Sequence, residues 1–159
     1  MNTPESQLRY ELQMLLDDYA ATIDEDRLEE WPDLFLEDCL YEIIPKENES
    51  AGLPIGIIRC DNRRMMRDRV ISLRNANIYA PAIYRHFLSA LRIHSVAGDT
   101  VDFSCNYLVI NSNQMGQSLV YQTGRYQDRV VRTPEGWRFV QKWAVYDTSR
   151  VQTLLAIPV

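Results

Sequence analysis

The chain has 159 residues, 46% of them hydrophobic and 25% charged, which is the composition of a single soluble domain with its own core over residues 1–159. Its net charge of −5 argues against nucleic acid as a partner, because backbone phosphates demand a basic face. It has no apolar run of about 18 residues that would span a membrane and does not open with a signal-peptide pattern, so we expect a cytoplasmic protein.

The first part of the chain predicts two helices and two short strands. Thr3-Pro4-Glu5 is typical of a helix start, and apolar residues follow at helical spacing to about Ala21 or Thr22. A short second helix fits Glu25–Trp31 and ends before Pro32. Two strands are expected, separated by a polar loop: Cys39–Pro45 and Ile55–Cys60.

A third helix is expected over Arg63–Asn75, with Asp61 or Asn62 as its cap. One face of this helix is apolar. The other carries a cluster of arginines: Arg63, Arg64, Arg67, Arg69 and Arg74. The cluster fits either a solvated face or an ion-paired contact with another subunit, because the planar guanidinium of arginine suits carboxylates.

The second half of the chain predicts four long strands. They begin at Ala82 and continue through Val101–Asn113, Gln117–Thr133 and Trp137–Thr148. Short turn signals separate them, so consecutive strands must pair antiparallel. Helices segregated from an antiparallel sheet define the α+β class. A sheet of about six strands, curled around the N-terminal helices, would form a cone with a central hollow.

The C-terminal segment Val151–Val159 is too apolar to extend freely into water, so we expect it to pack on its own sheet or on a neighbouring subunit. Leu154 and Leu155 are its candidate contact residues, and Trp143 and Tyr146 are assigned to the same surface. The alternative for these two positions is the core, where aromatic residues at strand spacing more often lie.

The metal-binding residue types are sparse. Cys39, Cys60 and Cys105 are far apart and form no C-x-x-C pair. The two histidines, His86 and His94, would lie about 26 Å apart along a straight strand, so they share no metal unless the strand bends sharply. A Rieske centre needs two Cys and two His, and a mononuclear iron needs two His and a carboxylate. We therefore expect neither a metal nor a cofactor in this chain.

The order of the elements and a series of short motifs carry a family resemblance. The motifs are Tyr19 with Ile23-Asp24, Trp31–Asp38 with Tyr41, Asp61-Asn62 with Met66–Leu73, Tyr84–Ser89, Gly124–Asp128, Gly136-Trp137 and Tyr146–Thr148. With these the chain resembles the small (β) subunit of Rieske-type aromatic ring-hydroxylating oxygenases, within the nuclear-transport-factor-2-like superfamily. The stretch Leu73–His86 resembles the branch that acts on aromatic acids such as salicylate, terephthalate or anthranilate.

The resemblance implies a partner and an assembly. In the family, a large (α) subunit holds a Rieske [2Fe–2S] centre and a mononuclear Fe(II), and small subunits form a trimeric base in an α3β3 complex. The resemblance thus implies a structural, non-catalytic subunit of an oxidoreductase of aromatic catabolism, either a dioxygenase or a monooxygenase, which uses O2 and electrons from NAD(P)H. One departure is Asn106-Tyr107-Leu108, where the family often has arginines. Interface contacts at that point do not carry over.

Two other interpretations remain open. Ketosteroid isomerases and scytalone dehydratase resemble this architecture, so a self-contained isomerase or dehydratase would use Asp24, Tyr41 and His86 for general acid and base chemistry in the cone. The simpler interpretation is that Asp24 caps the short helix and His86 bonds to a neighbour, because a fold alone does not give a function. The second of the two other interpretations is a ligand-binding or scaffolding module of the same fold that carries out no reaction.

Overall fold

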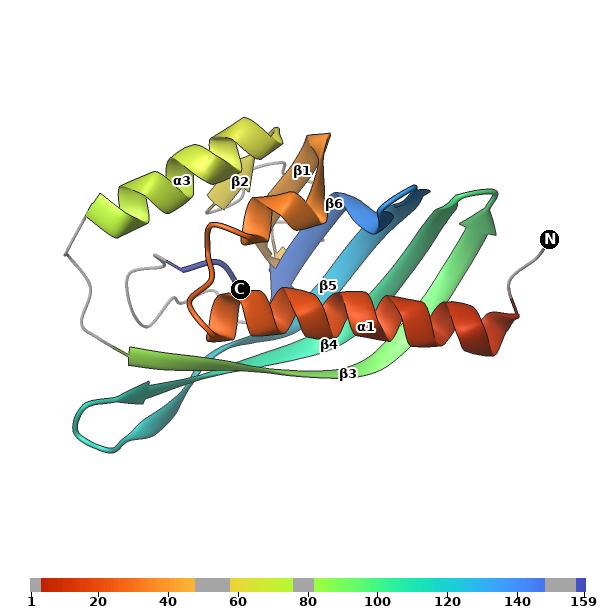
Figure 1. Cartoon of the computed structure of the whole chain (residues 1–159). Helices are drawn as coiled ribbons and strands as arrows, with labels where there is room; N and C mark the ends of the chain where they lie inside the picture. The colour runs from red at the N-terminus through yellow and green to blue at the C-terminus, as the bar shows by residue number, and fades with distance from the viewer. Residues whose placement is uncertain (1–3, 48–57, 76–81, 148–156) are drawn as a thin grey trace.

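The computed structural model describes residues 4–47, 58–75, 82–147 and 157–159 (Figure 1). The elements in chain order are α1 (Glu5–Asp24), the 3-10 helix η1 (Trp31–Leu34), β1 (Phe35–Pro45), β2 (Ile58–Cys60), α3 (Arg63–Asn75), β3 (Ala82–Ala97), β4 (Thr100–Asn113), β5 (Ser118–Thr133) and β6 (Gly136–Tyr146). The predicted α+β class and the six-stranded curved sheet packed on helices are confirmed.

The six strands form one open sheet in the order β2-β1-β6-β5-β4-β3. Figure 1 shows α1 lying across the concave side of this sheet and α3 beside β1 and β2. Neighbouring strands pair antiparallel, with one exception: β1 pairs parallel with β6. A short turn forces antiparallel pairing only on the two strands that it connects. Because β1 and β6 are far apart in sequence, their orientation could not be predicted in this way.

The two long helices follow their apolar spacing. The buried residues of α1 are Leu8, Leu12, Leu15, Leu16, Tyr19, Ala20, Thr22 and Ile23, one stripe facing the sheet. The helix extends to Asp24, slightly beyond the predicted end. Helix α3 has the predicted bounds. Of its two candidate caps, Asn62 accepts a hydrogen bond from the Met65 backbone N–H at 2.9 Å, as an N-cap side chain does.

The helix predicted at Glu25–Trp31 is wrong. Residues 25–30 form turns, and a 3-10 helix follows at Trp31–Leu34 with Pro32 in its first turn. Asp26 adopts a positive φ of 59°, which an α-helix does not accommodate. Proline suits a first helical turn because its missing N–H would have no partner there. Strand β1 consequently begins at Phe35, earlier than the predicted Cys39.

Two further predictions fall partly outside the described residues. Strand β2 is described over Ile58–Cys60, so the first part of the predicted Ile55–Cys60 strand is not covered. Leu154 and Leu155 also lie outside the described residues. At the end of the chain, Ile157 packs against the core and Val159 is buried in it, so this part of the tail packs on its own sheet.

The free edge of β3 is covered by side chains from α1. The Asp24 carboxylate accepts a hydrogen bond from the backbone N–H of His86 at 2.8 Å. The Arg9 guanidinium donates to the backbone carbonyl of Leu91 at 2.7 Å. Edge strands expose backbone groups that can pair with another chain, and these two contacts remove one donor and one acceptor from that edge. Within the described residues, no helix is both long and apolar enough to cross a membrane.

Candidate functional site

Aromatic side chains fill the interior of the cone. Those that are almost completely shielded from solvent include Tyr19, Trp31, Phe35, Tyr41, Tyr126 and Phe139. They meet mostly edge to face; the Trp31 and Tyr41 ring centroids, for example, are 5.0 Å apart, an arrangement that favours the attraction between ring edge and ring face. Around Tyr41 the interior is filled by the protein's own side chains.

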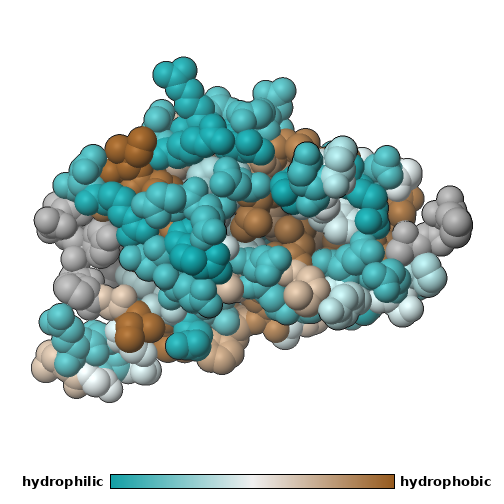
Figure 2. All heavy atoms as spheres, in the orientation of Figure 1, coloured by the Kyte–Doolittle hydropathy of each residue, from teal (hydrophilic) through white to brown (hydrophobic). Residues whose placement is uncertain are grey.

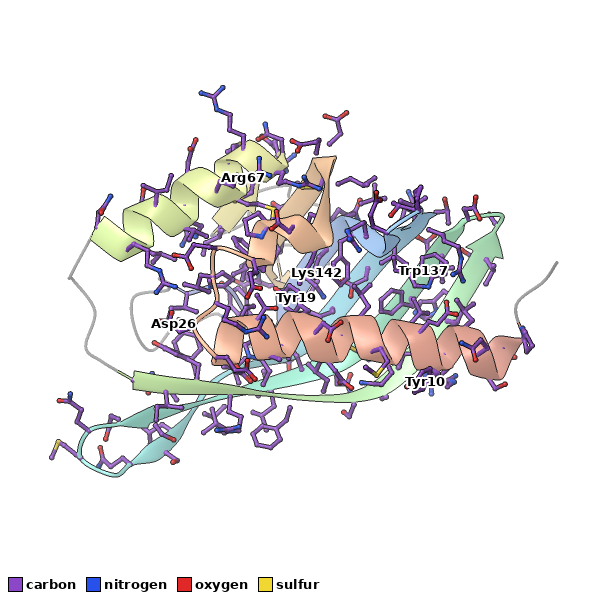
Figure 3. The ribbon with its side chains drawn as sticks, in the orientation of Figure 1. Tyr10, Tyr19, Asp26, Arg67, Trp137 and Lys142 are labelled. Atoms are coloured by element: carbon purple, nitrogen blue, oxygen red, sulfur yellow. The ribbon has the colours of Figure 1, made fainter. Side chains whose placement is uncertain are left out.

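A buried ion pair lies inside this aromatic interior. The Lys142 ammonium is 2.8 Å from Asp128 Oδ2, and neither side chain is exposed to solvent. The ammonium also lies 3.6 Å from the ring centroid of Tyr126 and 4.4 Å from that of Tyr19, within the range of a cation–π interaction. Figure 3 shows Lys142 and Tyr19 together between α1 and the sheet. The Phe139 ring centroid is a further 4.6 Å contact. Together these attractive contacts compensate the cation for its lost hydration.

The carboxylate of this pair is less well satisfied than the ammonium. Burial raises the pKa of Asp128 to about 6, and the nearby Lys142 opposes this rise. The second oxygen, Oδ1, is buried and has no hydrogen-bond partner among the described residues. Neither residue is a candidate site residue by sequence, although Asp128 ends the Gly124–Asp128 motif. Strand alternation places Asp128 on the inner face with Tyr126, but only the strand register, Asp128 opposite Lys142, reveals the pair.

Tyr41 has a structural partner in the interior. Its hydroxyl donates to the Val159 carbonyl oxygen at 3.0 Å and accepts from the Val159 N–H at 3.1 Å. The Tyr19 hydroxyl donates to the same carbonyl at 2.6 Å. Burial raises the pKa of Tyr41, so this phenol keeps its proton and acts as a hydrogen-bonding group. The two tyrosines thus hold Val159 in the core.

Asp24 and His86 meet where α1 ends beside β3. Asp24 Oδ1 lies 2.6 Å from His86 Nδ1, which must carry the proton in order to donate to a carboxylate. Asp24 Oδ2 accepts from the His86 backbone N–H. The predicted pair thus exists, but Tyr41 has a different partner. Asp24 does not cap a helix at Glu25, since none is present there.

The geometry of this pair limits its chemistry. His86 Nε2 is buried without a hydrogen-bond partner among the described residues. A cavity of about 330 Å³ lies beside the pair, lined by Asp17, Ala20, Ala21, Asp24, Glu25, Arg85, His86 and Leu88. A general base must reach a substrate proton within hydrogen-bond distance, and the buried Nε2 does not offer that access. The contact instead fixes the end of α1 to the sheet edge.

Replacing Asp24 with alanine should lower the free energy of unfolding by about 1–3 kcal/mol, because two buried donors of His86 lose their acceptor. Asp24→Asn should retain part of this stability, since the amide oxygen still accepts one hydrogen bond. Urea unfolding followed by circular dichroism measures both variants. Equal stability of Asp24→Ala and the unmodified chain would contradict the structural role.

The arginines of α3 mainly contact the preceding segment of the same chain. Arg63 donates through Nε and Nη2 to the Phe35 carbonyl and through Nη1 to Glu37 at 2.8 Å. Arg67 lies 3.8 Å from Asp33. Arg64 is exposed and has no ion pair among the described residues, whereas Arg69 is partly buried. Figure 3 labels Arg67 where α3 passes η1, which carries Asp33. The predicted cluster is therefore largely engaged within its own chain.

Arg74 forms ion pairs at the other end of α3. It donates to Asp26 and Glu29, each at 2.7 Å. The hydrogen bonds from Arg74 lower the pKa of Glu29 to about 2. This contribution to stability is present above the ordinary carboxyl pKa and is lost as the pH falls toward 2. Arg74→Gln should return the pKa of Glu29 toward its ordinary value, as measured by NMR titration. An unchanged Glu29 pKa would contradict the pairing.

The other predicted surface residues differ in exposure. Trp143 is partly exposed on β6, and its indole Nε1 is buried with no hydrogen-bond partner among the described residues. Tyr146 is buried.

The cysteines are free thiols, and the two histidines bond to different partners. Cys39, Cys60 and Cys105 are buried free thiols, and burial raises the pKa of Cys105 to about 12. His86 bonds to Asp24, and His94 Nε2 lies 2.7 Å from the Ser104 hydroxyl. Among the described residues, no three His, Cys, Asp or Glu side chains form a group that fits a metal ion. These residues do not fit a Rieske centre or a mononuclear iron.

Comparisons with known proteins place the chain in a family. Residues 4–142 match the SnoaL-like domain. The chain is 53% identical over 150 residues, 94% of its length and 93% of the relative's, to the anthranilate 1,2-dioxygenase small subunit of Burkholderia cepacia. The chain belongs to the small-subunit family of aromatic ring-hydroxylating dioxygenases. The family resemblance found in the sequence is thereby confirmed.

Further relatives agree with this membership. The β1 subunit of the terminal oxygenase component of terephthalate 1,2-dioxygenase from a Comamonas species is 34% identical to this small subunit, over 88% of this chain and 91% of the relative. A solved structure from Novosphingobium aromaticivorans, described as the beta subunit of an aromatic-ring-hydroxylating dioxygenase, is 37% identical with a TM-score of 0.87. It covers 94% of this chain and 95% of that one. Membership in this family implies a large oxygenase subunit as partner and does not favour the cone-pocket enzyme.

Proposed function

We propose that this chain is the structural small subunit of an α3β3 oxygenase whose large subunit hydroxylates an aromatic acid of the anthranilate type. The observation that carries the proposal is the 53% identity to the anthranilate dioxygenase small subunit over nearly the full length of both chains. The terephthalate dioxygenase β subunits are less similar, at 34% and 35% identity. An aminobenzoate is therefore the first substrate to test.

In this proposal the chemistry belongs to the partner. The large subunit would hold the Rieske [2Fe–2S] centre and the mononuclear Fe(II), and a reductase would deliver electrons from NAD(P)H for the reaction with O2. The small subunit would form a trimeric base in the cytoplasm that holds a Rieske centre on one large subunit facing the iron on the next. The packed aromatic interior and the buried Lys142–Asp128 pair support this role, because they stiffen the cone and leave no substrate space around Tyr41.

The residues of the subunit contacts also remain proposals. Of the α3 arginines, Arg64 is the one best placed for a partner, since its guanidinium is exposed and has no ion pair among the described residues. Trp143 is partly exposed on β6 and stays in the proposed set.

The test is to purify the chain alone and together with the large oxygenase subunit encoded beside it. We expect the chain alone to be colourless with a native mass near three times 18.6 kDa. The joint preparation should contain iron in a much larger complex that consumes O2 and anthranilate when supplied with reductase and NAD(P)H. A stable monomer that binds no iron-containing large subunit would overturn the proposal. Turnover of terephthalate but not anthranilate would overturn the substrate assignment.

A further inference from the structure

A groove crosses strands β3, β4 and β5 on the face of the sheet turned away from α1. Its volume is about 520 Å³, and Phe87, Asn106, Leu108 and Arg125 are among its lining residues. This volume lies within the range of small-molecule sites. We call it the β3–β5 groove. Figure 2 shows apolar side chains beside hydrophilic ones along the rim below β3.

The strand register arranges the lining residues in two adjacent rows. Phe87 lies opposite Leu108, and Asn106 lies opposite Arg125. Leu108 and Asn106 are two residues apart on β4, so their side chains point to the same face of the sheet. An apolar row and a polar row therefore run side by side through the β3–β5 groove.

The apolar row offers a surface for a planar ring. Phe87 is 53% exposed, although it is a large aromatic side chain, and Leu108 beside it is partly exposed. A ring that stacks on this pair removes apolar surface from water, and aromatic pairs gain further from offset or edge-to-face contact.

The polar row offers hydrogen-bond donors that nothing in the chain uses. Arg125 is exposed and makes no ion pair among the described residues, and the exposed Asn106 amide makes no hydrogen bond among them. Lys46 is a second lining cation. One lining carboxylate, Asp147, accepts a hydrogen bond from Thr123 at 3.0 Å. Two cations against this carboxylate make the groove locally positive on a chain of net charge −5, which suits an anion.

The spacing between the rows fits one small molecule. Leu108 and Arg125 lie on neighbouring strands, offset by two residues, so their Cα atoms are about 8 Å apart by the strand spacings. The long arginine side chain spans such a distance. A ring lying on Phe87 and Leu108 can therefore direct a carboxylate attached to it toward Arg125.

We propose that the β3–β5 groove is a binding site for a small aromatic carboxylate. The ring would stack on Phe87 and Leu108, and the carboxylate would accept hydrogen bonds from the Arg125 guanidinium, whose planar fork matches it, and from the Asn106 amide. The inference goes beyond the proposed function, because this site lies on the small subunit and not on the subunit that would hold the iron. A protein surface is the competing occupant, but a stable protein interface needs a far larger area than this groove provides.

The test titrates benzoate into the purified full chain and follows binding by saturation-transfer NMR. We expect a dissociation constant in the millimolar range, typical of so small a ligand in an open groove. Benzamide has the same shape without the charge, so it should bind at least about tenfold more weakly. Equal binding of the two ligands, or no binding of benzoate, would overturn the inference.

Variants locate the binding in the β3–β5 groove. Arg125→Gln should raise the dissociation constant for benzoate at least about tenfold, and Phe87→Ser should weaken binding without changing a charge. Both side chains are exposed, and circular dichroism verifies that the variants are folded. Arg92→Gln is the matched control, because Arg92 is also exposed on β3 and makes no ion pair among the described residues but does not line the groove. Unchanged binding in Arg125→Gln, or an equal loss in Arg92→Gln, would contradict the site.

Adding the large subunit decides between a ligand and a protein as the occupant. The Arg125-dependent binding, measured as the difference between the unmodified chain and Arg125→Gln, should persist in the complex. If the large subunit removes it, the groove is a subunit contact and the inference is overturned. Benzoate binding is first measured on the chain alone. Failure of that chain to bind an iron-containing large subunit would therefore sink the proposed function and leave this site standing.

Discussion

Replacing Lys142 with methionine should lower the free energy of unfolding by about 3–5 kcal/mol, because the substitution leaves the buried Asp128 carboxylate without its counter-ion. Methionine fills most of the lysine volume, so the loss reports the charge rather than a cavity. Urea unfolding at neutral pH, followed by tryptophan fluorescence, measures the difference. Stability equal to that of the unmodified chain would show that the pair contributes nothing.

The matched control is the double variant Lys142→Met/Asp128→Leu. Replacing both partners of a buried ion pair by apolar residues is often neutral or stabilising. The double variant should therefore regain most of the stability that Lys142→Met loses. If it remains as unstable as the single variant, packing of the lysine stem, and not the ion pair, is what the interior requires.

The stability lost in the single variant Lys142→Met should depend on pH in a defined direction. Burial raises the pKa of Asp128 to about 6, above the value of about 3.9 in an unfolded chain. A raised pKa in the folded chain means that folding favours the protonated carboxyl group. The stability that this group contributes is therefore fully present below its pKa in the unfolded chain and is lost as the pH rises through its pKa in the folded chain. Without Lys142, which lowers this pKa, the stability deficit should shrink as the pH falls from 7 toward 4. The double variant, which lacks the carboxyl group, should not show this trend.

Gly124→Ala should be the most damaging small substitution, with a loss on the order of 3 kcal/mol or more, typical of overpacking against fixed atoms. A methyl group at this position would meet the Val145 carbonyl oxygen, and would lie 2.8 Å from both the Tyr107 hydroxyl and the Tyr146 Cα. Two of these neighbours are backbone, so they cannot rotate away. Thermal unfolding and the yield of folded protein measure the effect.

Gly98→Ala provides the control for Gly124→Ala. Gly98 has a φ of 61° and nothing within 4 Å of an added methyl group. Its substitution should cost about 1–2 kcal/mol, from the left-handed backbone alone. Equal losses of stability at the two positions would contradict the idea that Gly124 is needed for the close approach of β5 to β6.

The elements with local signals were predictable from the sequence. Helix α3 has its predicted bounds because an apolar spacing and a capping side chain at Asn62 both act within a few residues. The long strands β4, β5 and β6 lie within one or two residues of their predictions, because glycines mark their turns. The region around Asp26 was mispredicted, since its turn depends on a positive φ that no neighbouring residue signals.

Features that depend on register or on distant contacts were not predictable. Asp24 and His86 were selected as a pair and do lie together, but their position where the end of α1 meets the edge strand β3 depends on tertiary packing. Lys142 and Asp128 lie 14 residues apart in sequence and meet only through the pairing of β5 with β6. The arginines of α3 were recognised as a cluster, but their partners were not. Arg63 and Arg67 contact β1 and η1, and Arg74 contacts the turn at residues 25–30, whose path was mispredicted.

The parallel pairing of β1 with β6 has a consequence for the time course of folding. Ile43 pairs with Ala144, a contact that must close a loop of roughly 100 residues, and such long-range closures slow folding. During synthesis the β3–β6 meander can form as each hairpin emerges, but β1 must wait beside α1 until the last strand has left the ribosome. The aromatic residues of β1 then stay uncovered until β6 has emerged, which makes the nascent chain prone to aggregate during that interval.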